Sequence, residues 1–215
     1  YYNGVIEQVA GGIGNVEHNS ILVRYSNDFS IWDLESVNHY KDQTDIFFTC
    51  HEFSYNKIAE AYEPYLGLIR QMFHKYCSGT LEEFMEECDV YKLQRPVFES
   101  YFEKGFCERT EQILIDEVEY EQERMRNSIV TMLQKLSEIR PVVIVLNRFQ
   151  LASKSTMQLS NSLLQTKNKN IGIVLGVNDV QSIPEFAHEE WDAICESMDD
   201  RNMVYHIGNA GRNME

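Results

Sequence analysis

Three short segments of this 215-residue chain carry side chains that could hold a phosphorylated ligand. The first is a glycine turn, Gly11-Gly12-Ile13-Gly14, with Asn15 and Val16 after it. A glycine turn between a strand and a helix brings backbone N–H groups close to phosphate oxygens. The other two segments each follow an apolar, strand-like run. The candidate ligand-binding residues are therefore Gly11, Gly12, Gly14, Asn15, Val16, Asn147, Arg148 and Asn178.

The glycine turn lacks the residues that make a phosphate loop catalytic. A working loop reads G-x-x-x-x-G-K-[ST], because the lysine neutralises phosphate oxygens and the hydroxyl holds magnesium. Here Gly14 is followed by Asn15 and Val16, and the first lysine of the chain is Lys41. Ser20 would supply a displaced hydroxyl only if the loop carried an insertion. The simpler interpretation is a plain turn that joins a strand to a helix.

The second segment, Asn147-Arg148, stands where magnesium would need carboxylates. Acids at the end of a buried strand hold the ion and orient the attacking water in phosphoryl transfer. No carboxylate follows until Asp179. Arg148 should repel magnesium, although it could neutralise a bound phosphate. Asn178 either bonds a ligand or serves only turn chemistry. We expect no hydrolysis, no required cofactor and no bound metal, and ATP or ADP is the ligand class left open.

Other catalytic patterns are absent from the sequence. The five cysteines have neither CxxC spacing nor a disulfide-framework pattern, which fits a reducing compartment and no catalytic thiol. His51-Glu52 and His188-Glu189 lack the HExxH spacing of a zinc site. Ser153 is better placed to cap a helix than to act as a nucleophile.

The elements that would position these residues follow a βαβ pattern. Strands are predicted at residues 5–9, 45–50, 141–147, 171–177 and 203–207, and a helix is expected through residues 21–25. The third and fourth runs are apolar throughout, as strands covered on both faces are. The pattern predicts a doubly wound α/β fold with a mainly parallel sheet. Val143, Val145, Ile173 and Leu175 should lie in its core.

A helical insert is predicted at about residues 55–139, between the second and third strands. Apolar residues recur there at helical spacing, with Pro64 at the start or a kink of one helix. Thr80 and Glu83 form the sequence signature of a capping box. Residues 108–139 read as one long helix with an acidic outer face. We expect residues 1–215 to form a single domain, cut from a longer protein, with the insert as a cap.

Four segments taken in order resemble the STAND and AAA-like signalling ATPases, and the resemblance covers most of the chain. They are the Gly-Gly-Ile-Gly turn, the run from Asp45 to Cys50 followed by Tyr62-Glu63-Pro64-Tyr65, the run from Pro141 to Ala152, and the strand that ends at Gly176-Val177-Asn178-Asp179. The third is similar to that family's Walker B strand, and the fourth to its sensor strand. The resemblance implies a P-loop NTPase-like fold with degenerate Walker motifs.

Three functions are compatible with that resemblance. The first is a catalytically inactive, ATPase-like regulatory or scaffolding domain of a multidomain signalling or transcription-regulatory protein. The second is an ATP/ADP-binding switch with slow or no hydrolysis. The third, an active ATPase, would need a lysine and an acid from another chain or segment.

Charge and hydropathy narrow the choice of partners. The net charge is −15, from 19 basic and 34 acidic residues, which disfavours direct nucleic-acid binding. No apolar run reaches the ~18 residues needed to span a membrane. We expect a cytoplasmic protein whose partners are other domains of the same protein or separate proteins, with self-association left open.

Overall fold

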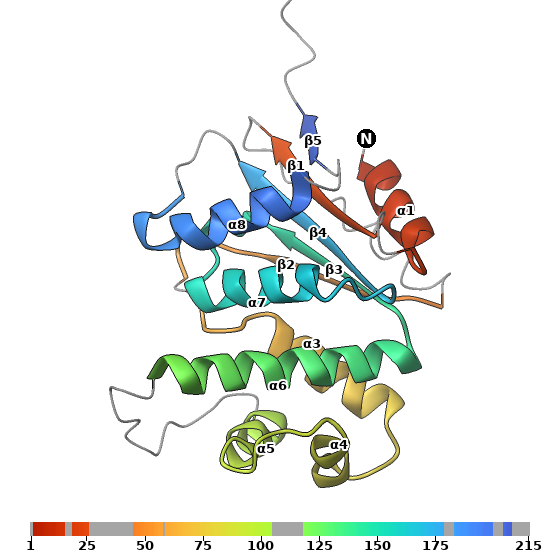
Figure 1. The fold of residues 1–215 in the computed structure, drawn as a ribbon. Coiled ribbons are helices and arrows are strands. Elements are labelled where there is room, and N and C mark those ends of the chain that lie inside the picture. The colour runs from red at the N-terminus through yellow and green to blue at the C-terminus, as the bar shows by residue number, and fades with distance from the viewer. Residues whose placement is uncertain are drawn as a thin grey trace, which may run out of the picture. The chain divides into compact units, whose positions relative to one another are not determined.

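The computed structural model describes residues 2–15, 19–25, 45–57, 59–104, 118–178, 183–199 and 204–207. The chain divides into two compact units (Figure 1). The first contains residues 1–61 and 140–215, and the second contains residues 62–139. The second unit falls within the predicted helical insert, and each unit is described separately below.

A parallel sheet forms the centre of the first unit. Its five strands lie in the order β2-β3-β4-β1-β5, and every neighbouring pair is parallel. The fold is therefore α/β and is compatible with a doubly wound arrangement, as predicted. The strands are β1 (Ser20–Tyr25), β2 (Phe47–Glu52), β3 (Val142–Asn147), β4 (Ile171–Asn178) and β5 (Val204–Ile207).

Helices cover both faces of this sheet. Helix α1 (Tyr2–Gly12) packs on one face, where Val5, Ile6 and Val9 join a buried cluster with residues of β1 to β4. Helices α7 (Lys154–Gln165) and α8 (His188–Asp199) pack together on the opposite face (Figure 1). Short 3-10 turns, η2 (Phe149–Leu151) and η3 (Glu185–Ala187), precede these two helices.

The two central strands carry the core predicted from the sequence. Val143, Val145 and Leu175 are fully buried, and Ile173 is 1% exposed. Every residue of β3 and β4 is buried, which explains their apolar character on both faces. The predicted burial of these four residues is confirmed.

The start of the chain corrects the prediction. Residues 5–9 lie in helix α1, not in a strand, and the strand of this region is β1 at Ser20–Tyr25, where a helix was expected. The buried residues Val5, Ile6 and Val9 have the i, i+1, i+4 spacing of one helix face. The continuous apolar run Ile21-Leu22-Val23 is instead typical of a strand covered on both faces.

Helix α1 approaches the sheet closely at Gly172 of β4. A Cβ atom added there would lie 2.7 Å from a methyl carbon of Val9 and 2.9 Å from the backbone oxygen of Asn19. Only glycine fits this position without displacing the helix or the chain before β1. The glycine therefore determines how near α1 lies to the sheet.

The second unit is helical. It contains α3 (Tyr65–Tyr76), α4 (Leu81–Glu87), α5 (Arg95–Lys104) and α6 (Val118–Ile139). The ring of Phe73 lies 5.2 Å from that of Phe84 and 5.6 Å from that of Phe102, which joins three helices. The capping box predicted at Thr80 and Glu83 is confirmed. Of the predicted helix 108–139, residues 118–139 are helical and residues 108–117 lie outside the described residues.

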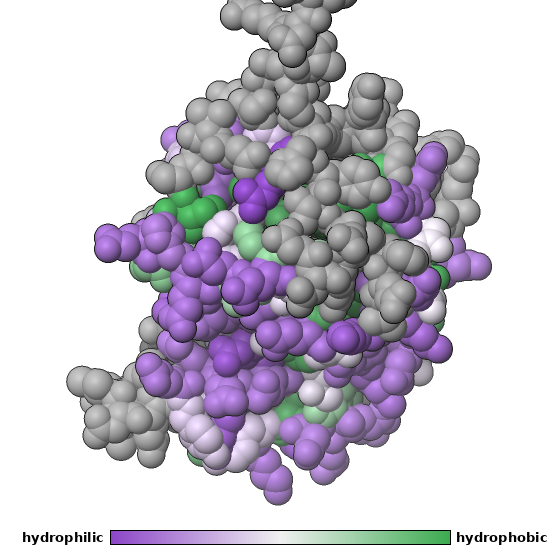
Figure 2. Space-filling view, turned by 45° about the horizontal axis from the view of Figure 1, so that its top comes forward, coloured by the Kyte–Doolittle hydropathy of each residue, from purple (hydrophilic) through white to green (hydrophobic). Residues whose placement is uncertain are grey.

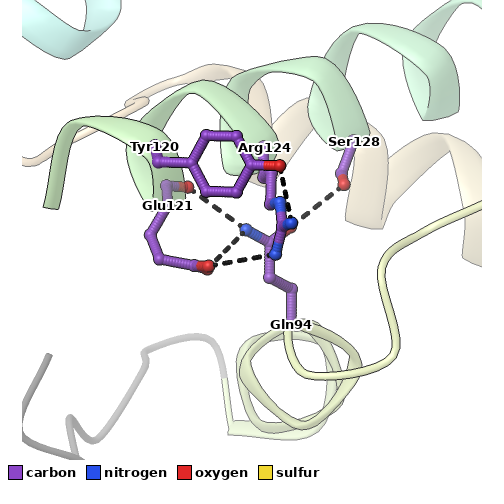
Figure 3. A network of polar contacts seen from close by, with 5 residues as sticks. All are labelled: Gln94, Tyr120, Glu121, Arg124 and Ser128. Atoms are coloured by element: carbon purple, nitrogen blue, oxygen red, sulfur yellow. Dashed lines mark hydrogen bonds and ion pairs between the residues drawn. The ribbon is translucent and has the colours of Figure 1, made fainter. Parts of the chain in front are cut away.

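A polar network fixes the turn before α5 to α6 (Figure 3). The buried Gln94 donates from Nε2 to the Glu121 backbone oxygen at 3.2 Å and accepts from Ser128 Oγ at 3.1 Å. The Arg124 guanidinium lies 4.0 Å from the ring centroids of both Tyr91 and Tyr120. These contacts account for a polar residue buried between helices, and they have a structural role.

The surface of the described residues is largely hydrophilic in the face shown in Figure 2. This agrees with the net charge of −15. No described helix has the length and apolar character required to cross a membrane.

Candidate functional site at the carboxyl ends of the strands

Four polar side chains come from the last residues of four strands. They are Glu52 of β2, Asn147 of β3, Asn178 of β4 and Tyr25 of β1. Pairing sets Glu52 beside Asn147 and Tyr25 beside Asn178. Side chains alternate between the faces of a strand, and these positions have the parity of the buried cluster beneath α1. The apolar α1 face of the sheet therefore ends in a polar row.

Two members of the row, Tyr25 of β1 and Asn178 of β4, flank the topological switch point of the sheet. The chain leaves β1 for β2 at one edge, whereas it leaves β4 for β5 at the other edge, and β1 and β4 are neighbours (Figure 1). Ligands of open α/β sheets bind outside the carboxyl ends of the strands where connections diverge in this way. The position of the row is thus the expected place for a ligand site.

Asn147 is the centre of the row and is fully buried. Its Oδ1 accepts hydrogen bonds from Tyr25 Oη at 3.0 Å and from the Arg148 backbone N–H at 2.8 Å. The backbone N–H can only donate, so the amide cannot be flipped. Its Nδ2 is buried and has no hydrogen-bond partner among the described residues. A buried donor without an acceptor costs about 1–3 kcal/mol.

Tyr25 reaches Asn147 across a whole strand, because β4 lies between β1 and β3. On β4, Gly176 pairs with Val23 and has the same face parity. The absence of a side chain at Gly176 leaves room for the tyrosine to cross. Tyr25 is 2% exposed. Its ring therefore belongs to the apolar core beneath α1, and its hydroxyl belongs to the polar row.

Arg148 follows Asn147 in a left-handed backbone conformation, with φ 52° and ψ 43°. This conformation is uncommon for a non-glycine residue and costs of order 1 kcal/mol. It begins η2, and the Asn147 side chain holds its N–H group. Arg148 Nε lies 3.2 Å from Glu52 Oε1, and the two side chains are 29% and 41% exposed. Among the described residues, an ion pair of Arg148 and Glu52 therefore lies at the rim of the site.

Behind the row, Gln150 links the turn after β3 to the end of β4. The Asn178 backbone N–H donates to Gln150 Oε1 at 3.4 Å, and Gln150 is fully buried. The adjacent Phe149 ring packs against Trp191 of α8 with centroids 6.4 Å apart. A displacement of the turn at Arg148 would consequently reach both β4 and α8.

The first turns of α7 and α8 hold a second polar group on the opposite face. Lys154 Nζ lies 3.1 Å from Glu190 Oε1, and Gln158 Nε2 donates to the same oxygen at 2.9 Å. Burial alone would raise the pKa of Glu190, but hydrogen bonds from its backbone amide, Lys154 and Gln158 outweigh burial and lower that pKa. This group connects two helices, and nothing in its contacts points to a reaction.

The structure separates the predicted ligand-binding residues into two groups. Asn147, Arg148 and Asn178 lie at the carboxyl ends of β3 and β4. Gly11 and Gly12 end helix α1, and the Gly14 N–H donates to Lys169 O at 2.7 Å, just before β4 begins. Asn15 bonds back to Gly12, and Val16 lies outside the described residues.

These two groups do not form one site. A six-residue strand is ~20 Å long, and the glycines lie at the amino end of β1 and β4. Gly14 has φ +96°, which is the left-handed conformation of a residue that terminates a helix. The glycine turn is therefore a helix C-terminus leading into a strand, the reverse of the predicted order.

Sequence reasoning missed Glu52 and Tyr25. Glu52 is the second residue after the predicted strand at residues 45–50, and a polar residue near that strand end was the available signal. Tyr25 was assigned to a helix. Their proximity to Asn147 depends on strand order and register, which the sequence does not contain.

The described polar groups at the row include one carboxylate, one guanidinium and a buried amide donor. Of the last residues of the five strands, only Glu52 carries a carboxylate, and Arg148 pairs with it. In the described part of the chain, no three His, Cys, Asp or Glu side chains form a group that could hold a metal ion. Magnesium in phosphoryl transfer is usually held by one or two carboxylates plus phosphate oxygens.

The helical unit contains a cavity of about 390 Å³ lined by residues including Phe73, Cys77, Glu87 and Lys135. Burial, and then the charge of Glu87, raise the pKa of the Cys77 thiol. Burial raises the pKa of nearby Cys88 to about 12. Neither thiol is activated as a nucleophile, so this cavity is a weaker candidate than the strand ends.

Comparisons with family models, with curated proteins and with solved structures find no match for this chain.

Proposed function

We propose that this chain is an α/β domain of the P-loop type that has lost nucleotide hydrolysis and acts as a regulatory or scaffolding module. The observation that carries the proposal is the end of β3, Asn147-Arg148, whose cation is paired with Glu52. Stabilising a transferring phosphoryl group requires magnesium and preorganised positive charge around it. Asn147 Oδ1 already accepts two hydrogen bonds, and Arg148 is paired with Glu52, so this strand end offers neither a carboxylate for magnesium nor a free cation.

The corrected position of the first strand supports the same proposal. A phosphate loop would follow β1, which ends at Tyr25. The sequence from residue 26 to residue 40, SNDFSIWDLESVNHY, contains no glycine and no lysine. Both halves of the catalytic apparatus are thus missing from the chain at the positions where this fold type would need them.

The parent protein is proposed to be a cytoplasmic, multidomain signalling or transcription-regulatory protein. The partners of the domain would be neighbouring domains or other proteins, and it would not bind nucleic acid directly. The net charge of −15 supports that last point. Self-association is compatible with the same role.

The test is steady-state phosphate release from ATP with magnesium, measured on the wild-type chain and on Asn147→Ala. We expect no release above background from either protein. Magnesium-dependent release that disappears in Asn147→Ala would show an active site at the strand ends and overturn the proposal. Release that is equal in both proteins would point to a contaminating enzyme.

A second candidate function is an ATP/ADP-binding switch that does not hydrolyse. It is favoured by the buried Nδ2 of Asn147, which has no partner among the described residues, beside the half-exposed Arg148. Calorimetric titration with ATP and ADP separates this function from pure scaffolding, because a scaffold gives no binding heat with either nucleotide.

A further inference from the structure

We infer that the carboxyl ends of β2 and β3 form a magnesium-independent receiving site for a phosphate-type oxyanion, with Glu52 as a built-in competitor that the ligand displaces from Arg148. This inference rests on the proposed loss of the magnesium site. The ligand class is a phosphate or diphosphate group, either free or as part of a nucleotide.

The first step concerns Arg148, whose position is fixed by its backbone. The Asn147 side chain accepts its N–H at 2.8 Å, and its φ of 52° turns the chain into η2. Phe149 and Gln150, the next two residues, are completely buried, and their burial holds this turn in place. The base of the Arg148 side chain is therefore fixed at the carboxyl end of β3, and the planar donors of the guanidinium suit a phosphate oxygen pair.

The second step concerns Glu52, which now occupies that guanidinium. Glu52 is the register partner of Asn147, and its carboxylate is 3.2 Å from Arg148 Nε. Both side chains are substantially exposed, so the pair contributes only about 0–1 kcal/mol. A ligand carrying two or more negative charges can replace one monovalent carboxylate at this cost.

The third step concerns the amide of Asn147. Its Oδ1 is committed to Tyr25 and Arg148, and its Nδ2 is the donor left over. A ligand oxygen that displaces Glu52 would find this donor one residue from the cation it binds. Satisfying a buried donor recovers part of the cost of leaving it unpaired.

The charge balance sets the strength of binding. The chain carries a net charge of −15, which opposes any anion at long range. Binding should therefore be weak and should weaken further with salt. Magnesium should not strengthen it, because the ion would have to lie beside Arg148.

The experiment is calorimetric titration of pyrophosphate, orthophosphate and ATP, each in EDTA, into the wild-type chain and variants. Glu52→Gln removes the competitor and should tighten pyrophosphate binding by about two- to fivefold. Arg148→Gln should abolish measurable binding. Asn147→Asp keeps the acceptor for the Arg148 N–H but replaces the free donor by an anion, and should weaken binding by about tenfold or more.

The matched control is Asp45→Asn, because Asp45 pairs with Arg140 at 3.5 Å before the same two strands begin. It changes the net charge by the same amount at the opposite end of the sheet. Affinity should stay at the wild-type value in this variant. ATP binding tighter than pyrophosphate would identify a nucleotide as the source of the phosphate, and equal or weaker binding would identify a free anion.

Three results would overturn the inference. The first is that Glu52→Gln binds pyrophosphate no more tightly than wild type. The second is that Asp45→Asn tightens pyrophosphate binding as much as Glu52→Gln does. The third is that no probe binds to wild type or to Glu52→Gln, which would mean that only water can satisfy the Asn147 donor. None of these results involves hydrolysis, so the inference can fail while the proposed function stands. Magnesium-dependent phosphate release would instead remove the proposed function.

Discussion

Two buried asparagines at opposite ends of the same sheet have opposite hydrogen-bonding states. Asn19, at the amino end of β1, is 2% exposed and donates from Nδ2 to Asn168 O at 2.7 Å and to Ile171 O at 2.9 Å. Its Oδ1 accepts from Ser20 Oγ at 3.3 Å. Asn147, at the carboxyl end of β3, leaves its Nδ2 without a partner among the described residues.

The difference separates an asparagine whose donors are both used by the backbone from one that keeps a free donor for a ligand. At the amino end, Asn19 satisfies backbone carbonyls of the loop before β4, and Gly172 lets α1 pack closely. At the carboxyl end, the free donor of Asn147 lies beside the left-handed Arg148 and its ion pair. The amino end also has a left-handed residue, Lys167 with φ 50°, and an exposed ion pair, Arg140 with Asp45. An unsatisfied buried donor such as that of Asn147 is of the kind found at functional sites.

The largest expected loss of stability comes from the middle of the sheet, and it serves as a reference for changes at either end of the strands. Leu175→Ala, in the middle of the fully buried β4, should lower the free energy of unfolding by about 3 kcal/mol through lost burial and a cavity. Chemical denaturation measures this directly. A loss below about 1 kcal/mol would show that β4 is not a central strand. The two asparagines would then not lie at opposite ends of one buried sheet.

The comparison itself is tested by one isosteric change made at each asparagine. Asn19→Asp places a carboxylate oxygen against two carbonyl oxygens, so it should cost about 2–4 kcal/mol at neutral pH. Asn147→Asp buries a carboxylate as well, but it keeps both bonds to Oδ1, lies next to Arg148 and opposes no carbonyl oxygen, so it should cost less than Asn19→Asp.

Denaturation at pH 7 and pH 4 measures both variants. The cost of Asn19→Asp should shrink at the lower pH, because a protonated carboxyl can donate to one of the two carbonyls. Equal costs for the two variants at pH 7 would mean that the Asn147 amide is as well satisfied as that of Asn19.

The smallest effect concerns Glu190, on the α7 and α8 face. Its lowered pKa means that it stabilises the fold above its unfolded value of ~4.3. This contribution should be lost as the pH falls through its folded pKa. Glu190→Gln should therefore be less stable than wild type by at most about 1 kcal/mol at pH 7 and equal to it near pH 2. A difference that persists at pH 2 would contradict the assigned cause.

The sequence was sufficient to predict most of the sheet. Strands β3 and β4 consist mostly of β-branched and other apolar residues, a pattern that predicts a covered parallel strand. Ser153 was also predicted as a helix cap, and its side chain accepts from the Thr156 N–H at 3.2 Å. Local patterns of this kind do not depend on the rest of the fold.

The first strand and the site could not be predicted in the same way. Val5 to Val9 is too short to distinguish helical from strand spacing, and a glycine turn follows a strand or a helix equally well. The Asn147 site joins Tyr25 and Glu52 through strand order and register. Those depend on which strands become neighbours, and that is a property of the whole sheet.

The most direct test of the account is a titration of ATP into the wild-type chain, once with magnesium and once with EDTA. The account holds that the carboxyl ends of the strands bind phosphate groups through Arg148 and the Asn147 amide, without a metal. It predicts weak binding that is no tighter with magnesium than with EDTA and that decreases as salt is added. Affinity that rises about tenfold or more with magnesium, accompanied by phosphate release, would contradict it.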